Sequence, residues 1–139
     1  MSVPRFIVGA TATAALFVAL DLACVACIFL PRYRRALGDR MRQRPSVIAA
    51  VCFYALHGAA LCVLVVFPVL ARDDPWERAA VMAAAGGGVL ACATYGTYAL
   101  TNYAVLADWP LELVLWDVPY GACLGAGVAA CAVSLAYCV

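Results

Sequence analysis

The sequence predicts an all-α protein, a bundle of four helices that cross a lipid bilayer. Of its 139 residues, 68% are hydrophobic and 12% are charged, and the mean hydropathy is +0.98. A water-soluble domain has about a quarter of its residues charged, and a small domain leaves much of its surface exposed. The excess of apolar side chains must therefore face lipid. Four apolar stretches, separated by three polar connections, account for the four helices.

Each apolar stretch is longer than the roughly 20 residues that a helix needs to cross the hydrocarbon core. In chain order, the predicted helices cover residues 6–30, 46–70, 79–106 and 111–137. Backbone polar groups in lipid must be hydrogen-bonded within the segment, which excludes open strands. The first stretch exceeds the apolar core of a signal peptide and is interrupted by Asp21, so we do not expect it to be cleaved. We expect a single integral membrane domain over residues 1–139.

Basic residues cluster in the first connection. All nine are arginine, and six of them lie between Arg32 and Arg44. The second connection, from Arg72 to Arg78, carries more acids than arginines. Cytoplasmic loops of membrane proteins are rich in arginine and lysine, so the first connection and the short third one are expected in the cytoplasm. Both termini are then expected on the non-cytoplasmic side.

Composition and motifs argue against several classes of function. The formal net charge of +1 does not favour a nucleic-acid partner. All eight cysteines lie in apolar runs, where cysteine packs as a small apolar residue. Cys24 and Cys27 are one helical turn apart, but zinc needs four ligands and the chain has one histidine, His57. The glycines at 86–88 lack the lysine and hydroxyl residue of a phosphate loop. We therefore expect neither a metal nor a cofactor.

The residues that are most costly to place in lipid mark a candidate pocket. Asp21 in the first helix and Asp117 in the fourth would each cost about 2.5–3.5 kcal/mol at the bilayer centre, so both should face the bundle interior or water. Tyr98 and Asn102 share one face of the third helix at a comparable depth. These residues predict a polar pocket on the cytoplasmic side, beneath the arginine-rich connection. The alternative is a network of interhelical hydrogen bonds that only fixes the packing.

Two further features allow two interpretations each. His57, near the middle of the second helix, could relay protons, or it could form a structural hydrogen bond to a neighbouring helix. Gly121 and Gly125 have the spacing of small residues on a helix-packing face. That face could contact a helix of the same chain or a helix of another subunit.

A longer pattern resembles a known family. The third helix contains the run Tyr-Gly-Thr-Tyr-Ala-Leu-Thr-Asn at residues 95–102, followed by Trp109-Pro110-Leu111 and by Asp117. The first helix contains Ala19-Leu20-Asp21. Over nearly the whole chain, this pattern resembles the small bacterial membrane proteins of the domain of unknown function 2177 family. The resemblance implies a four-helix protein of the bacterial inner membrane and no particular activity.

The resemblance also implies site residues. The positions that match the family pattern are Asp21, Thr101, Asn102 and Asp117. Two positions depart from it, since Ala99 stands where the family has an acid and Tyr120 where it tends to have tryptophan. An activity that requires the acid would be absent from this chain.

Three functional hypotheses follow, and the residues leave open whether the protein is an enzyme. The first is a pocket, formed by Asp21, Tyr98, Thr101, Asn102 and Asp117, that binds or passes a small solute, a proton or a lipid group. The second is a lipid-modifying enzyme in which a carboxyl acts as general acid or base. The third is a structural subunit that packs on a larger membrane partner, or on a second copy, through its small residues.

Overall fold

The computed structural model describes residues 2–139, and within them it contains helices and no strand. Four helical rods follow one another along the chain, and each is long and apolar enough to cross a membrane. The rods are Val3–Arg40, Val47–Ala71, Trp76–Val105 and Leu111–Ala136. The predicted fold class is confirmed.

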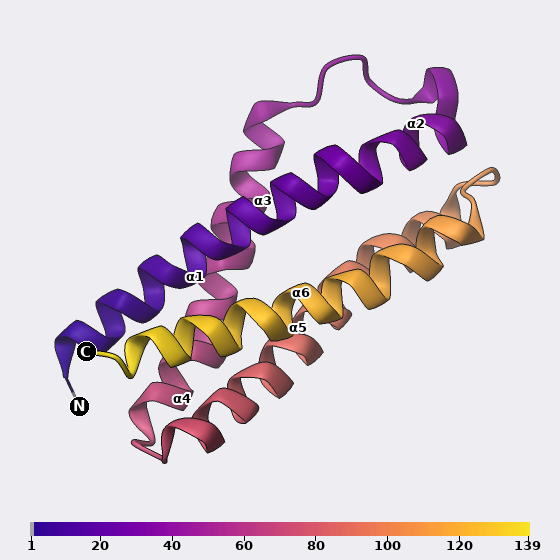
Figure 1. Cartoon of the computed structure of the whole chain (residues 1–139). Coiled ribbons are helices and arrows are strands. Elements are labelled where there is room, and N and C mark those ends of the chain that lie inside the picture. The colour runs from indigo at the N-terminus through magenta and orange to yellow at the C-terminus, as the bar shows by residue number, and fades with distance from the viewer. Residues whose placement is uncertain (1) are drawn as a thin grey trace.

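Two of the rods contain irregular turns (Figure 1). The first rod consists of α1 (Val3–Cys24), a π-helical turn (Val25–Phe29), α2 (Leu30–Leu37) and a 3-10 turn (Gly38–Arg40). The second rod consists of α3 (Val47–Leu61), a second π-helical turn (Cys62–Val66) and α4 (Phe67–Ala71). The third and fourth rods are the single helices α5 (Trp76–Val105) and α6 (Leu111–Ala136).

The first rod continues past Leu30, where the sequence predicted its end. Pro31 lies in the first turn of α2, and a π-helical turn precedes it. Proline donates no backbone hydrogen bond and its ring crowds the preceding turn, so a wider turn there lets the helix continue. Pro68 follows the second π-helical turn in the same way. As a consequence Tyr33, expected in a connection, lies on a helix.

The third rod also begins earlier than predicted. α5 starts at Trp76, directly after Pro75, whereas the prediction placed its start near residue 79. Glu77 lies in the first turn, where a negative charge stabilises the free N–H groups of the helix. Glu77 and Arg78 therefore belong to the first turn of α5 and not to the connection.

α5 and α6 form the closest helix pair, because small residues line their contact. A Cβ atom on Gly87 would collide with the carbonyl oxygen of Gly125, and one on Gly121 would collide with the ring of Tyr95. Glycine allows this close approach of two backbones. The glycine run at 86–88 lies inside an uninterrupted helix. Gly121 and Gly125 are buried against α5 of the same chain, so they offer no free surface to another subunit.

The core has two parts. The larger one is built where α1, the second rod and α6 meet, around Phe17, Leu61, Val66 and Val133, all fully buried. A smaller cluster closes the far end of α5 and α6, with Tyr33 packed against it. Its buried members are Ala99, Trp109, Leu113 and Val114.

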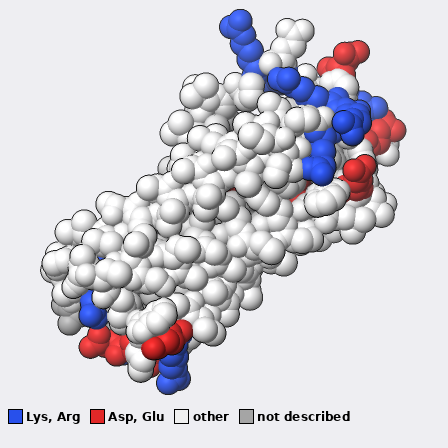
Figure 2. Space-filling model, in the orientation of Figure 1, with Lys and Arg blue, Asp and Glu red and all other residues white. Residues whose placement is uncertain are grey.

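On the face shown in Figure 2, the exposed charged side chains collect at the two ends of the molecule and leave a broad apolar band between them. Both chain termini lie at one end, where Arg5 forms an ion pair with Asp73 at 3.0 Å. The arginine-rich connection and the α5–α6 turn lie at the other end, joined by the ion pair of Arg40 with Asp108. An apolar band between two charged ends is the surface expected of a protein that spans a bilayer.

α3 diverges from α5 and α6 towards the arginine-rich end (Figure 1). α3 contacts α1, but it has almost no close contact with α5. Val47, Ile48 and Val51 in these turns are 60–79% exposed. The divergence opens a space between α3 and the other helices, and that space is the candidate site.

Candidate functional site

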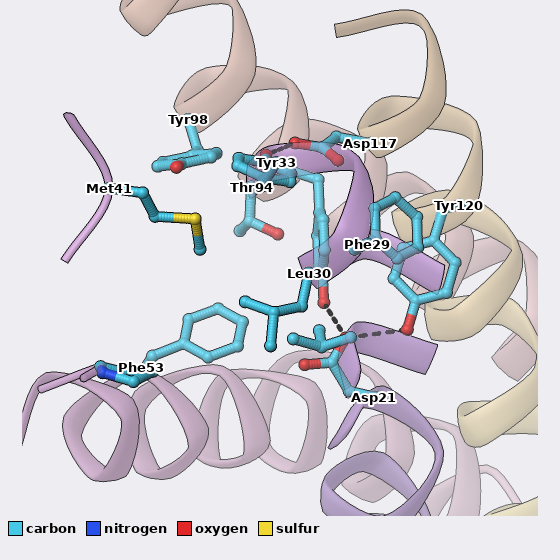
Figure 3. A pocket seen from close by; sticks show the side chains of 13 residues that line it. Asp21, Phe29, Leu30, Tyr33, Met41, Phe53, Thr94, Tyr98, Asp117 and Tyr120 are labelled. Atoms are coloured by element: carbon cyan, nitrogen blue, oxygen red, sulfur yellow. Dashed lines mark hydrogen bonds between the residues drawn. The ribbon is translucent and has the colours of Figure 1, made fainter. Parts of the chain in front are cut away.

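A cavity of about 500 Å³ lies between the four rods, near the arginine-rich end. Its volume falls in the range of small-molecule sites, about 300–1,000 Å³. Every rod contributes side chains, and Met41 and Pro45 come from the first connection. The remaining lining residues are Asp21, Val25, Phe29, Leu30, Tyr33, Phe53, Thr94, Tyr95, Tyr98, Asp117 and Tyr120. Figure 3 shows how most of these side chains converge on the cavity.

Asp21 is the hydrogen-bonding centre of the site. It lies on α1 and is 3% exposed. Its Oδ1 accepts hydrogen bonds from the hydroxyls of Tyr95 at 3.0 Å and Tyr120 at 2.9 Å, and its Oδ2 accepts one from Tyr54 at 2.9 Å. An ionised carboxylate has lone pairs for all three hydroxyls. Since the tyrosines belong to α5, α6 and α3, one carboxyl group links all four rods.

Asp117 is the second buried carboxyl, and its two oxygens differ. It lies on α6 and is 5% exposed. Its Oδ2 accepts a hydrogen bond from the hydroxyl of Tyr33 on α2 (Figure 3). Its Oδ1 accepts none from residues 2–139. Asp117, which lines the cavity, therefore keeps one oxygen without a hydrogen-bond partner in residues 2–139.

Aromatic rings form most of the remaining wall. The ring centroids of Phe29 and Tyr120 are 4.4 Å apart, and those of Tyr95 and Tyr120 are 6.0 Å apart. Phe53 on α3 packs edge-to-face against Tyr95 at 6.3 Å. Such tilted and edge-to-face pairs are favourable aromatic arrangements. The sequence predicted a polar pocket, whereas the structure shows an aromatic cavity with two acidic groups.

The structure brings together only part of the predicted site. Asp21, Tyr98 and Asp117 line the cavity, and Thr101 and Asn102 are not among its lining residues. The hydroxyl of Thr101 donates to backbone carbonyls of its own helix, including that of Tyr98 at 3.1 Å. The Asn102 side chain forms no hydrogen bond within residues 2–139. Thr101 is exposed and Asn102 is half-buried.

His57 lies next to the cavity but does not line it. Its ring is buried and stacks on Phe17, with centroids 4.5 Å apart and planes 16° apart. Its Nδ1 lies 3.4 Å from the hydroxyl oxygen of Thr94, a residue of the cavity wall. Its Nε2 has no hydrogen-bond partner within the described part of the chain. A proton relay through His57 stays a prediction.

Four tyrosines of the site were missing from the residues proposed from the sequence. Tyr33, Tyr54, Tyr95 and Tyr120 supply every hydroxyl that reaches the two carboxyls. A signal for them exists, because a phenol in an apolar helix needs a hydrogen-bond partner. Three of the four lie inside predicted helices, where few other polar groups are within reach.

Metal-binding side chains do not gather anywhere in residues 2–139, where no three His, Cys, Asp or Glu side chains form a group. All eight cysteines are free thiols, and most of them are exposed on the apolar band. Ala99, at the position where the resemblance implies an acid, is fully buried beside Trp109. Asp21 and Asp117 are therefore the acidic residues that line the cavity.

Comparison with known proteins supports this description of the chain as a membrane protein. A family model described as "Predicted membrane protein (DUF2177)" matches residues 6–134, nearly the whole length. No curated protein and no solved structure matches the chain.

Proposed function

The chain belongs to the DUF2177 family of predicted membrane proteins, and we propose that this member binds a small solute or a lipid group in its cavity. The observation that carries the proposal is that both buried carboxyls of residues 2–139, Asp21 and Asp117, border the same cavity of about 500 Å³. Each carboxyl in a membrane is costly, and such residues mark binding sites and pathways. Asp21 already links all four rods through its hydrogen bonds. The presence of Asp117 as a second buried carboxyl therefore supports a role beyond linking the helices.

The side of the cavity towards α3 and α5 supports a ligand that enters from the bilayer. Phe53 on α3 is 39% exposed and Tyr98 on α5 is 50% exposed, although both line the cavity. Figure 3 shows these two side chains and Met41 along the side opposite Tyr120. A molecule dissolved in the membrane could pass between the two diverging helices. Among the candidate ligands, this geometry favours a lipid group.

The proposal is tested by identifying the material that copurifies with the protein. The wild type should retain a small molecule or lipid near one per chain. Asp117→Asn should retain at least about tenfold less, because a charged hydrogen-bond partner contributes roughly 1.5–3 kcal/mol. Glu112→Gln, which removes an exposed carboxyl from the same helix, is the matched control and should behave as the wild type. Native mass spectrometry measures the bound fraction, and equal retention by Asp117→Asn would show the proposal to be wrong.

A lipid-modifying enzyme is the second candidate, and the free Oδ1 of Asp117 is the observation that favours it. A carboxyl oxygen with no partner in residues 2–139 can take up or release a proton from a molecule in the cavity. Overproduction should then change the lipid composition of the host membrane, and overproduction of Asp117→Asn should not. An unchanged lipid profile with the wild type would count against catalysis.

A further inference from the structure

The lining residues of the cavity that can carry a formal charge near neutral pH are all acidic. Two of its thirteen lining residues are aspartates, and none of those thirteen, all within residues 2–139, is basic. A low-dielectric wall strengthens the field of such charges inside a cavity. The cavity is therefore suited to a positively charged group.

The arginines at the same end of the molecule have other neighbours. The guanidinium of Arg32 lies over the ring of Trp116, 4.5 Å from its centroid. Arg40 forms the ion pair with Asp108, and Arg34 lines a separate hollow in the first connection. No arginine of the cluster reaches the cavity wall within residues 2–139. This arrangement disfavours a phosphate or carboxylate ligand in the cavity.

The aromatic rings supply a second attraction for a cation. Six of the lining residues are aromatic, namely Phe29, Tyr33, Phe53, Tyr95, Tyr98 and Tyr120. Ring faces attract cations, most strongly where water is excluded, and aromatic cages are a known means of binding quaternary ammonium groups. Tyr33, Tyr95 and Tyr120 direct their hydroxyl hydrogens to the carboxylates. A hydroxyl that donates its hydrogen in this way keeps an oxygen that can still act as an acceptor towards a ligand.

We propose that the cavity binds an organic cation, a primary or quaternary ammonium group, between its aromatic rings and the free Oδ1 of Asp117. This inference rests on the proposed function and names its ligand class. The ammonium group can belong to a small water-soluble amine or to a lipid headgroup. A lipid headgroup would enter between α3 and α5. The amine and the headgroup would be recognised by the same chemistry.

The test compares a cation with a neutral molecule of the same shape. Purified full-length protein in a non-ionic detergent is titrated with choline and with 3,3-dimethylbutan-1-ol, in which carbon replaces the charged nitrogen. Choline should bind about tenfold more tightly or better, as expected for a desolvated cation–π site with a carboxylate. Asp117→Asn should lose most of this preference, and Glu112→Gln should keep it. Calorimetry or native mass spectrometry measures both affinities.

Each other outcome is decisive. Equal affinity for the two compounds, lost in Asp117→Asn, would contradict the cation inference and leave the proposed function standing. A choline preference that survives in Asp117→Asn would place the cation elsewhere and overturn the inference. Binding of neither compound would also overturn it, and the copurification experiment then decides the proposed function separately.

The source of the ammonium group is resolved by a second pair of probes. Tetramethylammonium carries the head alone, and decyltrimethylammonium carries the same head on an apolar chain. If the two compounds displace choline equally well, the ligand is a small free amine. If the chain-bearing compound is at least about tenfold stronger than the head alone in the wild type, and gains less in Phe53→Ala, the ligand enters from the lipid through the α3–α5 opening.

Discussion

At the scale of single residues, Asp21 explains why a carboxyl can lie in the middle of an apolar helix. Three tyrosine hydroxyls from three other helices donate to its two oxygens at 2.9–3.0 Å. The hydrogen bonds replace the water that the carboxyl loses on burial. Removal of the carboxyl would leave three partly buried hydroxyls without their acceptor, which is costlier than the loss of the bonds alone.

Asp21→Ala should therefore lower the free energy of unfolding by about 1–3 kcal/mol, the range for buried polar groups left without a partner. The matched control is Asp39→Ala, which removes an exposed carboxyl from the first connection and should change stability by less than about 0.5 kcal/mol. Unfolding in mixed micelles of detergent and denaturing surfactant measures both. Equal stabilities of the two variants would contradict the role given to Asp21.

The sequence predicted the two carboxyls of the site, because charged residues in apolar helices are rare and costly. It did not predict their partners. Tyr54 and Tyr120 lie on different helices, and the rotation of each helix about its axis depends on packing that a single sequence does not reveal. Thr101 and Asn102 were predicted for the site on the basis of position in the helix and of a family pattern. Small rotations of α5 decide whether such side chains face the cavity or the surface.

At the scale of helices, the contact between α5 and α6 depends on glycine. A Cβ atom on Gly125 would collide with both Ala91 and the carbonyl oxygen of Gly87. Two residues further along α6, on roughly the opposite side of the helix, a Cβ on Gly127 would meet nothing within 4 Å in the described part of the chain. The same residue type in the same helix therefore has two different environments.

Gly125→Leu should destabilise the protein by about 1–3 kcal/mol or more, because two backbones must separate to admit the side chain. Gly127→Leu should be nearly neutral or slightly stabilising, since leucine favours helix and this position is exposed. Thermal unfolding in detergent compares them. Similar melting of the two variants would show that the α5–α6 contact is looser than the structure indicates.

Helix number and order were predictable from hydropathy, but two boundaries were not. Pro31 predicts a helix end, because proline normally breaks the hydrogen-bond ladder. A π-helical turn precedes Pro31 and lets the helix continue, so the first rod reaches Arg40. The sequence therefore predicts that Tyr33 lies in a connection. For this reason Tyr33, the hydrogen-bond partner of Asp117, is missing from the predicted site. The divergence of α3 from α5 also has no signal in the apolar pattern, because every side of α3 is hydrophobic.

At the scale of the whole molecule, the charge distribution predicts the orientation in the membrane. Six arginines lie at the end with the cavity, and both termini lie at the other end. The bias of basic residues towards the cytoplasm predicts that the cavity lies near the cytoplasmic side. The ligand would then be recognised at the level of the inner-leaflet headgroups.

Reporter fusions test this orientation. Alkaline phosphatase, which folds only outside the cytoplasm, should be active when fused after Val139 and inactive when inserted after Gln43. A fluorescent protein that folds in the cytoplasm should give the opposite pattern at the same two positions. The reverse result with both reporters would place the cavity near the outer side and overturn the assigned orientation.

The central claim is that the space between α3 and α5 is a binding site and not a gap that closes in the membrane. The most direct measurement is an experimental density map of the full chain, crystallised from a lipid mesophase. We expect α3 to remain apart from α5, with non-protein density in the cavity against Asp117 and the ring of Tyr98. A map in which α3 packs directly on α5, and the chain's own side chains fill the space, would contradict the account.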